Sequence, residues 1–598
     1  MSRITRPLVI ALLLAAASFA VADQLPRGRT GQGVIRPENA KPVDETQLVL
    51  VAEPEVEVDG LKANIRFRTA APAPAATVYF GTFEPDQQWT IPRYRRAAKE
   101  IRADMGTEHV VELKLGSLMA PEVDLVGAAK AGGAVVPYRI EVYDAKSART
   151  VFFDRVFAFQ DGKRAPTIAE GPFVDLVDAS SAVISWETDL PTRGEVIAAG
   201  KRFSAPGTST HFEIPITGLK SGAQTPYRVR IESGDFAFES REFAFKTDDP
   251  SSGELVFASF GDSREGVGGG ESQFGGTNYR TLARFFTAAA ESGAEFIIHS
   301  GDLVNGYTTS STDFAMQLAA FKRASGIVGH SVPVYEAMGN HEIVMDSFDV
   351  DGVGVVSFDK TGEDSSEAAF ARAFVNPRNG PKADAPGAPT YDENVYTFDR
   401  GRCRFVVFNN NYWWSSHAET YGGNLEGYVM DDQFAWMVRV FNEAKNDSRI
   451  DHVFLVAQEA MYPNGGHVAD AMWYHGGDPA KNDGVDRRYV VARRDEIWRA
   501  FVGTGKAAAA IFGDEHNYNR TWIGDELDPS YGGGAWQIIS GGAGAPYYAR
   551  ETNVPWAKFV KTFSARENWA LFRVKGSRVE IEVRSFAGEL IDRAVLKD

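Results

Sequence analysis

Five short polar clusters carry the side chains that could perform chemistry in this sequence. They read GDSR (261–264), GDLVNG (301–306), GNHE (339–342), QEAMYP (458–463) and GDEHNYNR (513–520). Each alone is weak evidence, because Gly-Asp pairs are common in turns and an aspartate often caps a helix. Together they supply carboxylates, amides and imidazoles beside glycines, which is the ligand set of a two-metal site. In such a site a bridging carboxylate holds two cations roughly 3.5–4 Å apart, which activate a water and clamp the oxygens of an in-line displacement.

Each cluster follows a stretch that is expected to form a buried strand. After Gly253, apolar strands such as ELVFASF and AAAAIF alternate with helical segments such as TNYRTLARFFTAAAESG and RRDEIWRAFVGTG. This alternation predicts an α/β layered domain over residues 253–598, with strands that are buried on both faces. Ligands bind at the carboxyl ends of the strands in open α/β sheets, so we expect the clusters to converge.

The order of the clusters resembles that of the calcineurin-like metallophosphoesterase superfamily. In that family the blocks read Asp-x-His, Gly-Asp, Gly-Asn-His-Asp/Glu, a histidine, and Gly-His-x-His. The glycine-rich stretch WQIISGGAGAPYY (536–548) is similar to the segment that follows the last block. The resemblance implies an αββα-layered domain that hydrolyses phosphate mono- or diesters with two divalent metal ions, and it leaves open whether these are Mn, Mg, Ca, Fe or Zn. The expected partner is therefore a phosphorylated small molecule or a phosphodiester.

Several residues take roles from this resemblance. Asp262 would bind the first metal and Asp302 would bridge both metals. Asn340 would bind the second metal and help to bind the substrate. His341 would contact the phosphoryl oxygens and protonate the leaving group as a catalytic residue. His516 would complete the first metal site.

The sequence departs from the family pattern at several of these positions. Arg264 stands where the first block has its histidine, and a guanidinium cannot ligate a metal. Because its fork fits phosphoryl oxygens, we expect Arg264 to bind substrate and to assist catalysis. Gln458 replaces the histidine of the fourth block, and Asp514 replaces the first histidine of the last block. Asn305 stands three residues after Asp302, where purple acid phosphatases have a tyrosine, and this argues against tyrosinate-iron chemistry.

The second metal site would then contain only oxygen ligands, from Asp302, Asn340, Gln458 and Asp514. Such a set favours Mg²⁺, Mn²⁺ or Ca²⁺ over Zn²⁺ and is consistent with a retuned, active site. The alternative is a catalytically impaired protein of the same fold that binds a metal, a phosphate group or a surface without turnover.

Four neighbouring polar residues have weaker claims to a role. Glu459 and Glu515 are expected either to be solvated or to orient a metal ligand from behind. His467 and His475, in the long loop 463–484, are additional ligand candidates for which an ordinary loop role is the expectation.

The region before Gly253 reads as all-β. Short alternating strands separated by Gly, Pro and Asp turns predict β-sandwich domains over residues 44–164 and 165–248. Trp186 and Tyr227 make the second of these resemble a fibronectin type III domain. Sandwich domains ahead of the catalytic domain resemble the secreted, purple-acid-phosphatase-like branch of the superfamily.

The N-terminus reads as a signal for export. Arg3 and Arg6 precede an apolar run and the tripeptide Ala20-Val21-Ala22, which is a secretory signal peptide with an A-x-A cleavage site over residues 1–22. A membrane anchor is the weaker alternative, because the run is short for a bilayer. We therefore predict a secreted or periplasmic protein. Residues 23–43 are polar and rich in Gly and Pro, as expected of a flexible leader.

Composition limits the remaining choices. The 598 residues are too many for one hydrophobic core. The net charge of -17 argues against a nucleic-acid-binding face. No later stretch is apolar and long enough to span a membrane, and the oligomeric state is left open. Cys403 is the only cysteine, which excludes an intramolecular disulfide and predicts a small buried side chain.

Overall fold

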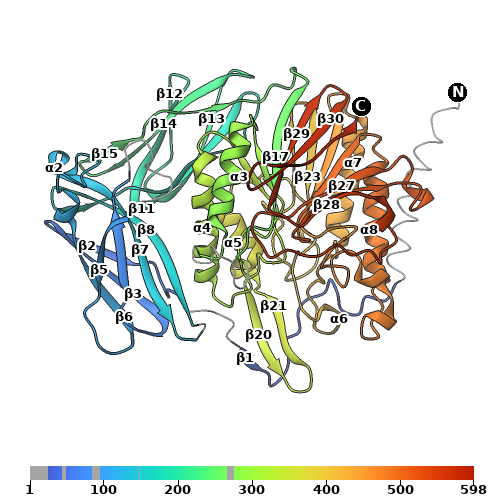
Figure 1. The fold of residues 1–598 in the computed structure, drawn as a ribbon, viewed down its shortest axis with the longest axis horizontal. Helices are drawn as coiled ribbons and strands as arrows, with labels where there is room; N and C mark the ends of the chain where they lie inside the picture. The colour runs from blue at the N-terminus through green and yellow to red at the C-terminus, as the bar shows by residue number, and fades with distance from the viewer. Residues whose placement is uncertain (1–24, 44–48, 84–93, 147, 266–274) are drawn as a thin grey trace.

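The computed structural model describes residues 25–43, 49–83, 94–146, 148–265 and 275–598. Two β-sandwiches occupy one side of the molecule in Figure 1, and a larger α/β unit occupies the other. The predicted signal peptide lies outside the described residues.

The first sandwich consists of a three-stranded sheet and a five-stranded sheet that pack face to face. Alternate residues along each strand point inward, as the polar–apolar alternation predicts, and side chains such as Ile65, Val78 and Phe157 form the core. The first sheet is β2 (Glu55–Asp59), β3 (Lys62–Ala73) and β6 (Gly106–Lys114). The second sheet is β5 (Tyr94–Lys99), β4 (Thr77–Gly81), β7 (Gly133–Asp144), β8 (Arg149–Gln160) and β9 (Lys163–Ala165), and a short helix α2 (Ala128–Ala131) precedes β7.

The second sandwich is organised by one long strand, β11 (Ser181–Ala198), that serves both of its faces. The first half of β11 pairs with two strands and its second half pairs with two others. Trp186 stacks on Phe212 in the core with a ring-centroid distance of 4.8 Å. The other strands are β10 (Ile168–Asp175), β12 (Lys201–Ser204), β13 (Ser209–Thr217), β14 (Gln224–Ser233), β15 (Phe236–Glu239) and β16 (Phe243–Lys246).

The α/β unit contains two sheets that pack face to face. The six-stranded sheet runs in the order β19 (Val334–Glu336), β18 (Ile297–His299), β17 (Glu254–Phe260), β29 (Asn568–Lys575), β30 (Arg578–Ser585) and β31 (Leu590–Lys597). The seven-stranded sheet runs in the order β22 (Tyr396–Arg400), β23 (Cys403–Val407), β24 (His452–Val456), β25 (Ala507–Phe512), β27 (Ala535–Ser540), β26 (Tyr518–Ile523) and β28 (Val560–Ser564). The strands that lead into the five polar clusters pair in parallel within each sheet.

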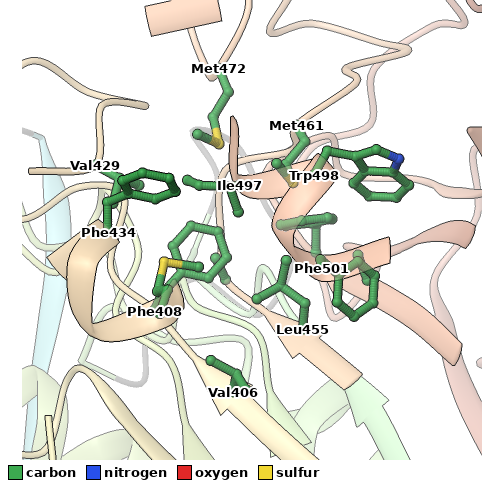
Figure 2. Close-up of a cluster of buried hydrophobic side chains, with 14 of the residues drawn as sticks. Val406, Phe408, Val429, Phe434, Leu455, Met461, Met472, Ile497, Trp498 and Phe501 are labelled. Atoms are coloured by element: carbon green, nitrogen blue, oxygen red, sulfur yellow. The ribbon is translucent and has the colours of Figure 1, made fainter. Parts of the chain in front are cut away.

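Helices cover the outer faces of both sheets, so the unit has the predicted αββα layers. Phenylalanine rings fill the space between the sheets, where Phe257 stacks on Phe572 at 4.6 Å. Cys403 is buried in the same layer, as predicted. The six-stranded sheet is covered by α3 (Tyr279–Glu291), α4 (Ser311–Gly329) and α5 (Ser366–Ala373). The seven-stranded sheet is covered by α7 (Asp431–Asn446) and α8 (Arg488–Val502) through the apolar cluster in Figure 2.

Helix α4 joins the α/β unit to both sandwiches. Its Met316 packs into the core of the first sandwich. Arg323 lies 3.2 Å from Asp154 of the first sandwich, and Lys322 lies 2.8 Å from Glu170 of the second. These contacts fix the sandwiches on the helical face of the unit (Figure 1).

Residues 25–43 correct the prediction of a flexible leader, because they are packed against the α/β unit. Backbone hydrogen bonds join residues 29–35 to residues 419–423, and β1 (Lys41–Val43) pairs with β20 (Met345–Val350) of the hairpin that β21 (Gly354–Asp359) completes. Arg27 donates a hydrogen bond to the Tyr428 hydroxyl at 2.7 Å. The backbone N–H and C=O groups of this polar segment therefore find hydrogen-bond partners on the α/β unit, near the short helix α6 (Ala418–Tyr421).

Within the described residues, no helix is both long enough and apolar enough to cross a bilayer.

Candidate metal centre

The polar clusters converge at the carboxyl ends of neighbouring strands. Asp262 follows β17, Asp302 follows β18, and Asn340 comes after β19. Gln458 follows β24, and the Asp514–His516 segment follows β25 of the other sheet. Because the two sheets face each other, these loops meet at one edge of the layered unit.

Three buried side chains form a compact group in which a cation could bind. One ligand atom from each of Asp262, Asp302 and His516 lies within 4.8 Å of the other two. The His516 ring donates from Nδ1 to the Pro546 carbonyl oxygen, and its Nε2 lies 3.6 Å from Asp262 Oδ1. A ligating histidine commonly has its second nitrogen held in this way, so the Nε2 lone pair is directed at the group.

The backbone at these ligands is held in a conformation that side chains rarely adopt. The φ angles are +62° at Asp262, +55° at Asp302, +69° at Asp514 and +43° at His516. A Cβ at Gly513 would lie 2.5 Å from Asp262 Oδ2, which explains why this neighbouring position is a glycine. Strain of this kind persists where the surrounding structure fixes a functional geometry.

Glu342 fixes the loop that carries Asp302. Its buried carboxylate accepts hydrogen bonds from the backbone N–H groups of Asp302 (2.9 Å), Leu303 (2.8 Å), Val304 (3.2 Å) and Gly339 (2.8 Å). Each bond to a charged acceptor contributes more than a neutral one. Two of the five polar clusters are thereby tied into one rigid frame.

Asn340 and Asp514 each have one buried side-chain oxygen that lacks a hydrogen-bond partner among the described residues. The Asn340 amide nitrogen donates to Glu426 Oε1 at 3.0 Å, which turns Asn340 Oδ1 away from that carboxylate. Both Asn340 Oδ1 and Asp514 Oδ2 are buried and have no hydrogen-bond partner among the described residues. A buried oxygen without a partner is costly, and a bound cation would satisfy it.

Gln458 and Asp514 contact each other next to this group. The Gln458 side chain lies over Gly301, where an added Cβ would come within 2.5 Å of its Cγ. Its amide lies 3.4 Å from Asp514 Oδ1, and the Asp514 N–H donates to Asp262 Oδ1 at 2.8 Å. Five of the predicted metal ligands therefore belong to one connected cluster, namely Asp262, Asp302, His516, Asp514 and Gln458.

The charges of the cluster are unbalanced without cations. Burial and the nearby Asp514 carboxylate raise the pKa of Asp262 to about 8. Burial and the carboxylates of Asp262 and Glu342 raise the pKa of Asp302 well above its usual range. Buried acids crowded in this way favour either shared protons or bound metal ions. Together with the unpartnered oxygens, they show that these residues fit divalent cations.

The two histidines of the cluster are held neutral. Burial, and then the Arg264 guanidinium, lower the pKa values of His341 and His516 well below 6.5. A neutral imidazole is the form that ligates a metal.

Arg264 and His341 both lie beside the Asp302 carboxylate. Arg264 Nε lies 3.5 Å from Asp302 Oδ2, and Arg264 Nη2 lies 3.4 Å from His516 Nε2. The guanidinium thus lies against two of the three residues of the buried group, Asp302 and His516. His341 donates from Nδ1 to the Asn305 carbonyl at 2.7 Å, which leaves its Nε2 4.0 Å from Asp302 Oδ2.

The structure also brings residues to the centre beyond the predicted metal ligands, Arg264 and His341. His467 reaches Asp514, and Glu426 orients Asn340. Tyr548 stacks on the His516 ring at 4.6 Å. Glu459 is fully buried next to Asp514. Burial, and then the Asp514 carboxylate, raise the pKa of Glu459 well above its usual value. The sequence named His467 and Glu459 as weaker candidates, and it pointed to Tyr548 only through the glycine-rich stretch 536–548 that resembles the family's last segment. Glu426 carried no such signal.

Comparison with known families and structures places this centre in context. The family model for calcineurin-like phosphoesterase matches residues 260–518. Similar solved structures include a dimetal phosphatase from Danio rerio, which is 12% identical with a TM-score of 0.35, covering 57% of this chain and 98% of that chain. The central fibronectin-III array of RIM-binding protein is 13% identical with a TM-score of 0.16, covering 36% of this chain and 80% of that chain. No curated protein matches the sequence.

Proposed function

We propose that the α/β unit, whose residues 260–518 match the family model for calcineurin-like phosphoesterase, hydrolyses phosphate mono- or diesters with two divalent cations. The observation that carries the proposal is the convergence of Asp262, Asp302 and His516 within 4.8 Å in a buried cluster. Asn340, Gln458 and Asp514 extend that cluster on the other side of the centre. Two cations bound there would supply Lewis-acid charge and lower the pKa of a coordinated water.

Asp302 is the residue that joins the two halves. Its carboxylate belongs to the group with Asp262 and His516, and its Oδ1 also accepts the His341 N–H at 3.2 Å. Three hydrogen bonds, from its own N–H and those of the next two residues to Glu342, hold its loop in place. Asp302 is therefore positioned before any ligand binds, and this preorganisation favours catalysis.

Arg264 and His341 are the groups that would meet the phosphoryl oxygens. The Arg264 guanidinium is a fixed positive charge with a planar set of donors that suits phosphate. His341 is neutral in the free protein, because burial and Arg264 lower its pKa. A bound, negatively charged phosphoryl group would raise that pKa and allow His341 to carry the proton that the leaving alcohol needs.

A second function is favoured by one specific contact. Because Arg264 lies 3.5 Å from Asp302 and 3.4 Å from His516, its guanidinium supplies a built-in positive charge at the first metal position. The domain would then bind one cation or a phosphate group without turnover.

A metal panel crossed with a substrate panel separates the two functions. We expect the purified protein to hydrolyse p-nitrophenyl phosphate or bis-p-nitrophenyl phosphate with Mn²⁺ or Mg²⁺, and Asp302→Ala to abolish this turnover. Asp399→Ala is the matched control, since Asp399 lies on β22 and pairs with Arg404 at a partly exposed position. No turnover with any divalent cation, together with a Tm that rises on addition of a divalent cation or inorganic phosphate, would establish the binding protein instead.

Export is a separate part of the proposal. It is supported by Arg3 and Arg6 ahead of an apolar run that ends in Ala20-Val21-Ala22. N-terminal sequencing of the protein recovered from the periplasm or medium should give a chain that begins at Asp23. An intact N-terminus in the cytosolic fraction would refute it.

A further inference from the structure

We infer that His467 supplies an imidazole ligand to the second cation, so that this half of the centre is not built from oxygens alone. The inference rests on the proposed function, because it concerns the same pair of cations. His467 comes from the loop between β24 and α8, and not from any of the five strand-end clusters.

The geometry of His467 is that of a metal ligand held from behind. Its Nε2 lies 3.5 Å from Asp514 Oδ1, and its Nδ1 lies 3.1 Å from Asp470 Oδ1. Donation from Nδ1 to Asp470 leaves Nε2 facing Asp514. Carboxylate–histidine–metal arrangements use this pattern to fix the tautomer and the direction of the lone pair.

His516 provides an internal comparison. It too has its Nδ1 held by an outer acceptor, the Pro546 carbonyl, while its Nε2 lies 3.6 Å from Asp262. The pair His516–Asp262 on one side is thus matched by the pair His467–Asp514 on the other. Each side of the centre offers one imidazole nitrogen beside one buried aspartate.

One tyrosine holds both rings in place. Tyr548 stacks on His516 at 4.6 Å with an interplanar angle of 19°. It meets His467 edge-on at 5.0 Å with an interplanar angle of 80°. A Cβ at Gly466 would lie 2.7 Å from the Tyr548 ring, so only a glycine allows the chain to pass close enough to place His467 there.

The loop that carries His467 is anchored on both sides. Met461 and Met472 are fully buried, and Figure 2 shows them in the core with Trp498 and Ile497 of α8. Tyr462 and Gln537 exchange hydrogen bonds of 2.9 and 2.8 Å. His467 therefore faces the centre from a fixed support, and binding a cation would cost little ordering entropy.

The competing role for His467 is a charged one. Burial disfavours the imidazolium, but the carboxylates of Asp514, Asp470 and Glu515 together raise the pKa of His467 well above 6.5 in the cation-free protein. As an imidazolium, it would remain paired with Asp514 and contact the substrate, leaving the second cation to oxygen ligands. Both roles place Nε2 at the same point, so activity alone does not separate them.

Metal binding and spectroscopy of the full chain separate the two roles. Mn²⁺ titration followed by electron paramagnetic resonance should give two Mn²⁺ per wild-type chain, and electron spin-echo modulation should report nitrogen on both. In His467→Ala we expect one class of Mn²⁺ to weaken by at least tenfold, and nitrogen modulation to remain only from His516. Free imidazole should restore the lost class.

A matched control and two outcomes complete the test. His475→Ala removes a histidine from the same loop and should leave both Mn²⁺ classes unchanged, and equal Tm values confirm folding. If His467→Ala keeps both classes and the full nitrogen signal, the ligand role is wrong while the two-cation function stands. If the wild-type chain itself binds no Mn²⁺, both proposals fail.

Discussion

The two halves of the metal centre are built in different ways. In the first half, Asp262 and His516 come from strand ends, and together with Asp302 they lie within 4.8 Å of one another. In the second half, Gln458 and Asp514 also come from strand ends, but the imidazole beside Asp514 comes from a long loop. Strand ends therefore fix where the ligands lie, whereas a loop anchored in the core can supply a residue type that the strand ends lack.

The largest effect should appear when Asp302, the proposed ligand of both cations, is compared with Asp514, the proposed ligand of the second cation alone. We expect Asp302→Asn to lose both cations and to reduce turnover by about 10³-fold or more, since several kcal/mol of charge stabilisation are removed. Asp514→Asn should lose only the second class of cation. Metal content and kcat/KM of the two variants measure this. Equal losses in both variants would contradict a bridging role that is particular to Asp302.

Restoring histidines to the second half distinguishes retuning from erosion. In Gln458→His/Asp514→His we expect the preferred cation to shift from Mn²⁺ or Mg²⁺ toward Zn²⁺, because imidazole suits the softer ion. Turnover with the preferred cation should remain within about tenfold of wild type, as expected for a retuned site. A metal panel on both proteins tests this. If turnover of the variant in Zn²⁺ instead exceeds the best wild-type turnover by much more than about tenfold, the wild-type site is eroded.

Crowding the Asp262 carboxylate in the first half should destabilise the protein. Gly513→Ala places a Cβ 2.5 Å from Asp262 Oδ2, and overpacking of this kind costs about 1–3 kcal/mol. Gly533→Ala is the control, because nothing lies within 4 Å of its added Cβ and its φ is not positive. Urea unfolding with and without Mn²⁺ measures the effect. Equal stability of both variants would mean that the close approach at Gly513 is not required.

A smaller effect concerns the pH dependence of the metal-free protein. The pKa of Asp262 is raised to about 8 by burial and by Asp514, so the folded state keeps a proton that the unfolded state releases near the ordinary pKa of 3.8. This group's contribution to stability is present below pH 3.8 and is lost as pH rises through about 8. Asp262→Asn does not titrate, so its stability relative to wild type should increase over that range.

Urea unfolding in EDTA at several pH values measures that difference. A difference between Asp262→Asn and wild type that stays constant with pH would show that Asp262 is not protonated in the folded protein.

Much of the α/β unit could be predicted from local sequence signals. Apolar strands that alternate with helices indicated the layers, and glycines beside aspartates marked the strand ends. The same signals placed Asp302 and Asn340 at the carboxyl ends of strands, because each follows a short apolar stretch that ends in a glycine. The family resemblance then assigned the roles.

The remaining features depend on contacts between distant parts of the chain. His467 has no periodic neighbours, and its place is set by Asp470, Tyr548 and the buried ends of its loop. The segment 25–43 has the composition of a loose leader, yet its backbone groups pair with residues 419–423. Composition reports the polarity of a segment and not the partner that satisfies it.

The central claim is that two cations flank the Asp302 carboxylate. Anomalous diffraction from crystals of the full chain grown with Mn²⁺ tests it most directly. The account predicts two peaks, one in contact with Asp262 and His516 and the other in contact with Asn340 and Asp514. A single peak, or peaks that do not touch Asp302, would contradict it.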